Sequence, residues 1–169
     1  MKPNLVTPPA AESRDLDFAL EKYLPFRLTV LSNRMTRSVA RIYGRHFRLS
    51  APEWRAMAVL GRYSAMTANQ VVSRTTMDKV RVSRAVARLL AAGYITRQSD
   101  PEDRRRAILA LTASGANVYR QVVPLVLAVE EEFLAGLSRE ERAALDRTLT
   151  KLEHYTSALP APDEASEED

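Results

Sequence analysis

The chain of 169 residues carries 25 Lys and Arg against 21 Asp and Glu, which gives a net charge of +4 and a pI near 9.6. Its length suits one domain or two very small ones, and a hydrophobic content of 46% argues against wholesale disorder. No cysteine is present, which excludes disulfides, thiolate zinc sites and thiol nucleophiles. His46 and His154 are far apart in sequence and no glycine-rich phosphate loop occurs, so we expect no enzyme, metal site or cofactor.

The apolar run near residues 122–129 is far shorter than the roughly 18 to 20 residues of a membrane span. The N-terminus also lacks a charged segment followed by an apolar one, the pattern of a secretion signal. We therefore expect a cytoplasmic protein with no membrane association.

Charge is distributed unevenly along the chain. Residues 51–112 hold eleven Lys and Arg against five acids, a net +6, which leaves −2 for the remainder. A basic segment inside an otherwise slightly acidic chain is the electrostatic footprint of a polyanion partner.

The first part of the chain reads as an arm and a helical region. Residues 1–14, with three prolines, are expected to be a flexible arm, and residues 15–48 have helical apolar spacing with a kink or break at Pro25. Helices are then predicted at 51–63, 67–74, 78–92 and 138–157. Three of these begin with capping boxes, in which the N-cap hydroxyl and the third helical residue satisfy each other's end groups: Ser50 with Glu53, Thr67 with Gln70, and Ser138 with Glu141.

Two short runs, 94–98 and 107–111, are predicted as strands joined by a polar loop that contains Asp100 and Pro101. A helix at about 112–136 follows, bent at Pro124, and residues 160–169 form an acidic tail. One face of that helix is expected to be apolar, with Val118, Val122, Leu125, Val129 and Phe133.

This order of elements predicts a mainly α fold with a small β-hairpin wing. A winged helix-turn-helix at 49–112 is flanked by dimerisation helices at 15–48 and 113–159. Long flanking helices with wide apolar faces must bury them somewhere, and packing against each other and a second copy is the simplest solution. We therefore expect a homodimer.

The helix at 78–92 has two distinct stripes. Val82, Val86 and Leu89 recur at the spacing of a buried face, whereas Arg81, Arg84 and Arg88 form a second, cationic stripe. Residues near the start of a recognition helix meet base edges in the major groove of duplex DNA, and arginine there can donate two bonds to guanine. By itself this stripe also fits a solvated helix face; the wing beside it favours DNA. The residues expected at the DNA in the helix-turn-helix are Asn69, Thr75, Thr76, Lys79, Val80, Arg81, Ser83, Arg84 and Arg88.

The wing loop ends in Asp103, Arg104, Arg105 and Arg106, all four expected at the DNA. Consecutive arginines on a thin hairpin suit a narrow minor groove. A carboxylate at that position would repel phosphate, so we interpret Asp103 as pairing with Arg105 and orienting it.

These motifs resemble the multiple-antibiotic-resistance regulator (MarR) family. The resemblance rests on the wing from Asp100 to Arg106, on Leu111-Thr112 with Gly115, and on the stretch from Val82 through Leu89 to Gly93 and Arg97. It implies a homodimeric regulator, usually a repressor at a pseudo-palindrome, that releases DNA when a small, often aromatic and anionic ligand enters a cleft beside the DNA-binding lobe. Position 106 departs from the family, which has a small or apolar residue there.

The tract LPFRLTVLSNRM is similar to the branch linked to breakdown of aromatic or hydroxycinnamic acids, some members of which sense coenzyme A thioesters. An aromatic acid or its acyl-CoA needs an apolar slot with a cation at its mouth. The candidate ligand-binding residues are Phe26, Arg27, Asn33, Arg34, Arg37, His46, Trp54 and Tyr63. Each also has a plain structural interpretation: Trp54 and Tyr63 as core residues and His46 as a surface histidine. Two other functions stay open: an architectural DNA-binding protein without an effector, and a winged-helix protein–protein module.

Overall fold

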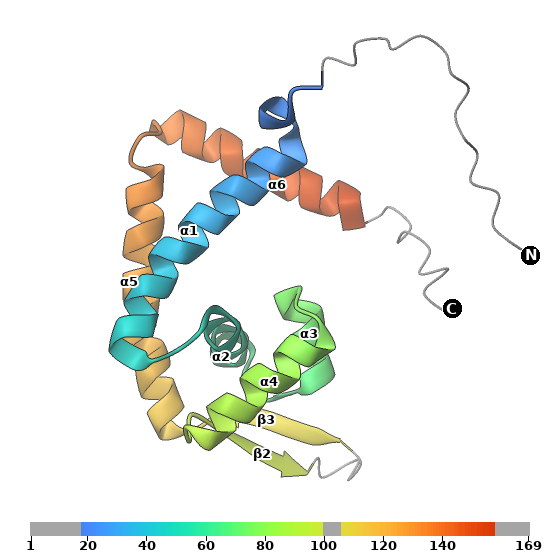
Figure 1. Cartoon of the computed structure of the whole chain (residues 1–169), viewed down its shortest axis with the longest axis vertical. Helices are drawn as coiled ribbons and strands as arrows, with labels where there is room; N and C mark the ends of the chain where they lie inside the picture. The colour runs from blue at the N-terminus through green and yellow to red at the C-terminus, as the bar shows by residue number, and fades with distance from the viewer. Residues whose placement is uncertain (1–17, 100–105, 158–169) are drawn as a thin grey trace, which may run out of the picture. The chain divides into compact units, whose positions relative to one another are not determined.

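The computed structural model describes residues 18–99 and 106–157 (Figure 1). The predicted fold class is confirmed: in the described residues, six α-helices and a small three-stranded antiparallel sheet make a winged helix-turn-helix with long flanking helices. Contacts divide the chain into a first unit, Met1–Arg34, and a second unit, Met35–Asp169, which are considered separately.

The described part of the first unit holds a short 3-10 turn, Leu20–Lys22, and the start of α1, Leu24–Phe47. Pro25 is the second residue of α1, and backbone N–H groups in the first turn have no partner within the helix, so the N–H that proline lacks is not needed there. The predicted interruption at Pro25 is thus a helix start rather than a kink within one long helix. The large apolar side chains here are all exposed: Phe18, Leu20, Tyr23, Leu24, Phe26, Leu28 and Leu31.

Three short helices follow in the second unit: α2, Ala51–Tyr63, α3, Ala68–Thr75, and α4, Lys79–Ala91. The predicted capping boxes of α2 and α3 are confirmed. The Ser50 amide donates to Glu53 Oε2 at 2.9 Å, and the Thr67 amide donates to Gln70 Oε1 at 2.8 Å. Such reciprocal bonds set where each helix begins.

The sheet contains one strand more than the sequence predicted. β2, Ile95–Ser99, and β3, Ala107–Leu111, pair antiparallel with Arg97 opposite Leu109, as expected of the wing. In addition β1, Met66–Thr67, pairs with the other edge of β3, Met66 opposite Leu109. A strand of two residues has no periodicity of its own, so only its tertiary partner reveals it.

Helix α5, Ala113–Leu134, continues through Pro124, and the third capping box starts α6, Arg139–Ser157, where the Ser138 amide donates to Glu141 Oε2 at 2.8 Å. Of the apolar face predicted for α5, the three valines are buried, but Leu125 and Phe133 are 38% and 39% exposed. The predicted face is therefore only partly covered within a single copy. No residue of α6 from Arg139 to Thr156 is buried.

The junction between the wing and α5 centres on Thr112. Its amide donates to the Tyr94 carbonyl at 3.0 Å, and its hydroxyl donates to the Gly93 carbonyl at 2.8 Å. The same hydroxyl accepts from the Gly115 amide at 3.0 Å and so caps α5. Gly115 lies so close to Tyr94 that an added Cβ would overlap the Tyr94 carbonyl oxygen. One threonine thus ties the start of β2, the end of β3 and the first turn of α5 together.

The core lies between α2, α3, α4 and the sheet, with residues from α1 and α5 beside it. It includes Tyr43, Ala56, Met57, Leu60, Val71, Val82, Leu89, Leu109 and Val122. This core holds the helix-turn-helix rigidly and leaves the outer side of α4 in solvent.

Candidate nucleic-acid interface

Helix α4 has one buried and one exposed side, as predicted. Val82, Val86 and Leu89 are 1%, 7% and 1% exposed and pack into the core. Asp78 caps the helix, its Oδ1 accepting from the Arg81 amide at 2.7 Å. The residues of this helix that were expected at the DNA are all exposed: Lys79, Val80, Arg81, Ser83, Arg84 and Arg88. The helix therefore presents a cationic surface backed by a fixed apolar one.

The three arginines of α4 differ in their electrostatic partners. Arg81 lies 3.2 Å from Asp78, Nε to Oδ2, and Arg88 lies 3.3 Å from Glu53, Nη1 to Oε1. Arg84 forms no ion pair with any residue that the structure describes. Its whole charge is therefore available to an outside anion, whereas part of the charge of the other two is offset.

The preceding helix and turn agree only in part with the expected contacts. Asn69, near the start of α3, is exposed, and Thr76, at its end, is exposed with a left-handed φ of 53°. Thr75 requires a correction, because its side chain is 6% exposed and its hydroxyl donates to the Val71 carbonyl at 2.7 Å. A hydroxyl buried and bonded in this way cannot reach a phosphate, so Thr75 is structural.

Three of the four expected wing residues, Asp103, Arg104 and Arg105, lie outside the described part of the chain. Arg106 is described and exposed, and it lines a hollow of about 420 Å³ together with Asn69 and Arg97. The helix-turn-helix and the base of the wing therefore face one hollow.

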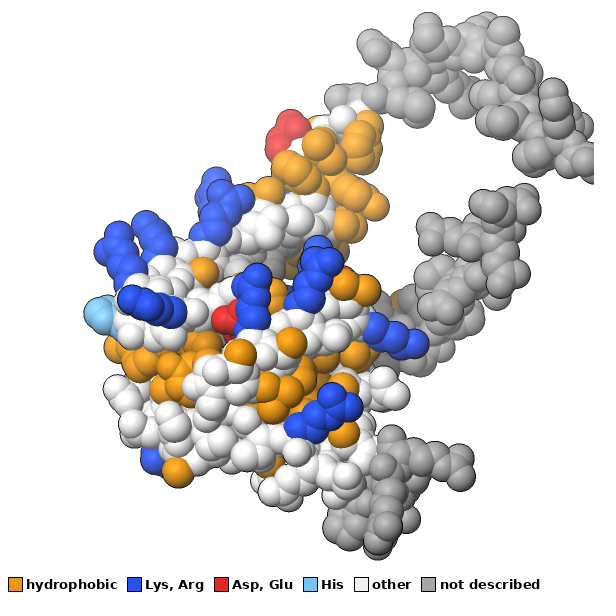
Figure 2. Space-filling view, turned by 60° about the horizontal axis from the view of Figure 1, so that its bottom comes forward, with side chains coloured by type: hydrophobic (Ala, Val, Ile, Leu, Met, Phe, Trp, Pro, Cys, Tyr) orange, Lys and Arg blue, Asp and Glu red, His pale blue; other side chains and the backbone are white. Residues whose placement is uncertain are grey.

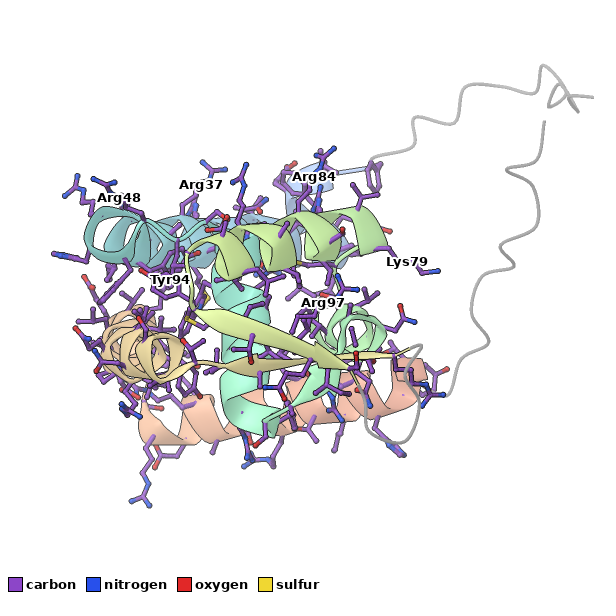
Figure 3. All side chains as sticks on the ribbon, turned by 90° about the horizontal axis from the view of Figure 1, so that it is seen from below. Arg37, Arg48, Lys79, Arg84, Tyr94 and Arg97 are labelled. Atoms are coloured by element: carbon purple, nitrogen blue, oxygen red, sulfur yellow. The ribbon has the colours of Figure 1, made fainter. Side chains whose placement is uncertain are left out.

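Arg97 is a candidate that sequence reasoning did not assign to the DNA. It lines that hollow and a groove of about 360 Å³ shared with Lys79 and Ser83. Figure 3 shows its side chain between β2 and α3. The sequence does show an arginine at an outward position of a predicted strand, which could have marked Arg97 as a candidate. Only the packing of the hairpin beside α3 shows which surface this side chain faces.

The C-terminal part of α1 is the second surface that the sequence did not assign to DNA. Arg37, Arg41 and Arg45 are exposed, as is Arg48 just after the helix. Within the second unit, Lys and Arg side chains gather on one face over α4 and the part of α1 from Met35 onward (Figure 2). Arg37 was expected at a ligand instead, and the other three arginines were not singled out.

The eight expected ligand residues are not brought together in one place. Four of them belong to the first unit and are exposed: Phe26, Arg27, Asn33 and Arg34. Of the four in the second unit, only His46 lines the pocket of about 710 Å³ between α1 and α5. Its other lining residues are Ser38, Arg41, Ile42, Arg45, Val129, Glu132 and Phe133.

Trp54 and Tyr63 have structural partners. The Trp54 ring stacks between those of Tyr43 and Tyr119, with centroids 6.0 and 6.1 Å away, which favours its interpretation as a core anchor. The Tyr63 ring is half exposed and lies 4.1 Å under the guanidinium of Arg74, so it does not fill the core. Cation–π stacking of this kind holds a tyrosine on the surface.

Across residues 18–99 and 106–157, no helix combines the length and apolar character required to cross a bilayer. Within the same residues, no three His, Asp or Glu side chains are grouped as metal ligands would be.

Residues 49–106 match the model of the MarR family. The chain is 27% identical over 104 residues to the transcriptional regulator HosA of Escherichia coli O111:H-, which covers 62% of this chain and 77% of HosA. A probable transcriptional regulator from Pseudomonas aeruginosa is 26% identical, with a TM-score of 0.68 over 79% of this chain and 99% of that one. Bordetella bronchiseptica BpsR, whose DNA binding is regulated by 6-hydroxynicotinic acid, is 23% identical, with a TM-score of 0.72 over 80% of this chain and 96% of BpsR.

Together these comparisons show that the chain is similar to winged-helix transcriptional regulators of the MarR family, and the family model matches its central third. The matched residues span α2 to the base of the wing, the same segment in which the basic charge is concentrated. At 23% identity, the likeness to BpsR shows a shared fold and no more.

Proposed function

We propose that this protein is a DNA-binding transcriptional regulator that reads the major groove with α4. The observation that carries the proposal is the division of α4 into a buried valine–leucine side and an exposed arginine side. A recognition helix needs that combination, because it must be held firmly and still offer donors to base edges. A mobility-shift assay with the DNA upstream of the chain's own gene tests it; binding no stronger than to random duplex would reject a sequence-reading role and favour a protein–protein module.

A homodimer would place two copies of α4 on successive major grooves, about 34 Å apart. Support comes from apolar surface that a single copy leaves uncovered. Leu145, Leu149 and Leu152 recur at helical spacing on α6 and are each 41% exposed, and Leu125 and Phe133 of α5 are also exposed. Such a stripe is typical of a helix that packs against a partner.

The mass in solution tests the dimer. Leu149→Glu would put a charge into the leucine stripe and is expected to shift the protein toward a monomer in sedimentation experiments. Thr150→Glu is the matched control, because Thr150 lies on the other side of α6 from that stripe. A wild-type monomer, or equal effects of the two substitutions, would contradict the proposal.

The regulator is further proposed to be a repressor that a small aromatic acid, or its coenzyme A thioester, releases from DNA. The pocket between α1 and α5 supports an anionic aromatic ligand, because apolar side chains from Ile42, Val129 and Phe133 lie beside the cations of Arg41 and Arg45. BpsR, of the same fold, is regulated by such an acid. Release requires that the ligand bind the DNA-free conformation more tightly than the DNA-bound one.

A thermal-shift screen with aromatic acids and their thioesters tests the effector. A true effector should raise Tm by mass action and weaken DNA binding in the same concentration range. Phe133→Ala should remove both effects. A protein that binds its promoter but responds to no such compound in either assay would be an architectural DNA-binding protein instead.

A further inference from the structure

Helix α1 has a one-sided charge composition. Between Leu24 and Phe47 the helix carries five arginines and no acidic residue. Arg37, Arg41 and Arg45 follow one another at intervals of four, so their like charges lie on neighbouring turns and repel. None of the three forms an ion pair with a described residue. No described acidic side chain offsets this repulsion, whereas an outside polyanion would.

Arg48 continues this line beyond the end of α1. It has a left-handed φ of 53°, a conformation that glycine or asparagine adopts more readily. Backbone strain of this kind tends to be kept where the side chain has a function. The Arg48 side chain is exposed, so packing does not account for the arginine.

The α1 arginines are continuous with the recognition helix. Arg48 and Arg88 line one hollow of about 530 Å³ between the α1–α2 turn and α4. Arg37, Arg48 and Arg84 project to the same side of the molecule (Figure 3). From Arg37 to Arg48 the line is about 16 Å long at 1.5 Å per residue, a length over which duplex DNA presents several phosphates.

We propose that Arg37, Arg41, Arg45 and Arg48, here called the α1 arginine line, bind the phosphate backbone of the same duplex that α4 reads. The contact extends the DNA-binding surface beyond the helix-turn-helix and wing and is indifferent to base sequence. This inference rests on the proposed function and adds a second contact surface to it. Arg41 and Arg45 also border the pocket between α1 and α5, so Arg37 and Arg48 give the cleaner test.

The experiment measures affinity for two duplexes, the promoter DNA and a random sequence of equal length, over a range of salt concentrations. The double substitution Arg37→Ala, Arg48→Gly should weaken both complexes by a similar factor, at least on the order of tenfold at low salt, and lower the salt slope by about 2 for each subunit on the DNA. Glycine relieves the positive φ at position 48, so the folded state is kept. Lysine at both positions should restore most of the affinity, because a phosphate contact needs charge more than geometry.

Arg120→Ala, an exposed arginine on α5, is the matched control and should leave the salt slope unchanged. An unchanged slope in the double variant would overturn the inference alone, whereas a wild-type protein that binds neither duplex would overturn the proposed function with it. Loss confined to the promoter duplex, or a change in the oligomeric mass, would assign these arginines to base reading or to the subunit interface and would also refute the phosphate contact.

Discussion

The guanidinium of Arg88 lies 3.3 Å from Oε1 of Glu53, a carboxylate that is only 6% exposed and whose Oε2 accepts from the Ser50 amide. One side chain thus caps α2 and anchors an arginine of α4. Because the Arg88 side chain is 72% exposed, solvent screens the pair, and the cap is the larger contribution to stability.

Glu53→Ala should therefore lower the free energy of unfolding by about 1–2 kcal/mol, since it removes the cap and the pair together. Glu53→Gln should cost less, because the amide oxygen can still accept from Ser50. Urea denaturation of the two variants decides the point, and equal losses would show that the charge, not the cap, dominates.

Arg84→Ala should weaken promoter binding by about 1–3 kcal/mol and relax preference for particular bases. The reason is that Arg84 has no ion pair within the described chain and lies on the exposed side of α4. Competition between promoter and random duplex measures both effects. Equal discrimination by the variant and the wild type would remove Arg84 from the reading surface.

Thr112→Val should lower the free energy of unfolding by about 1–2 kcal/mol, because valine keeps the shape but loses the bonds to the Gly93 carbonyl and the Gly115 amide. Thr112→Ser keeps the hydroxyl and should retain most of the stability. Chemical denaturation compares the two, and a serine variant as unstable as the valine variant would show that the methyl group, not the hydroxyl, matters.

Gly115→Ala should destabilise the fold by about 1–3 kcal/mol or more, because its Cβ would overlap a backbone oxygen of Tyr94 that cannot move alone. Gly136→Ala is the matched control: nothing lies within 4 Å of a Cβ there, so stability should stay the same or rise slightly. Thermal unfolding of both variants provides the measurement. Similar Tm values would mean that the backbone at Tyr94 can move away from residue 115 at little cost in stability.

Burial raises the pKa of the Tyr43 phenol above its usual value of 10.0, and the charge of Arg55 partly opposes the change. The folded state therefore keeps this proton to higher pH than the unfolded state does. Its contribution to stability is complete below pH 10 and is lost as pH rises through the raised pKa. Between pH 9 and pH 11, wild type should lose more stability than Tyr43→Phe, as measured by denaturation; parallel pH profiles would contradict the assignment.

Local sequence patterns predicted most of the helices and strands, because helix caps and side-chain spacing depend on residues that are close in sequence. The capping boxes at Ser50, Thr67 and Ser138 marked where α2, α3 and α6 begin, and all three are confirmed. The division of α4 followed from spacing alone, since Val82, Val86 and Leu89 return to one side of any α-helix. Of the kink or break predicted at Pro25, the structure has the break, with α1 beginning at Leu24, because proline favours the first turn of a helix over its interior.

Other features depended on residues far away in the chain. Strand β1 exists only because β3 offers it an edge, and Thr75 is buried only because α3 packs with that side inward. The position of Arg97 beside α3, and of Arg48 beside Arg88, likewise follows from packing between elements that the sequence separates.

The sequence by itself determined that the chain is a mainly helical winged helix-turn-helix with an arginine-bearing helix at its centre, because helix caps, helical spacing and charge are properties of adjacent residues. Only the tertiary structure decided which arginines keep their charge for an outside partner. Charge compensation depends on distance in space: Glu53 reaches Arg88 across 35 positions, while Arg84, one turn away from Arg88, forms no ion pair within the described chain.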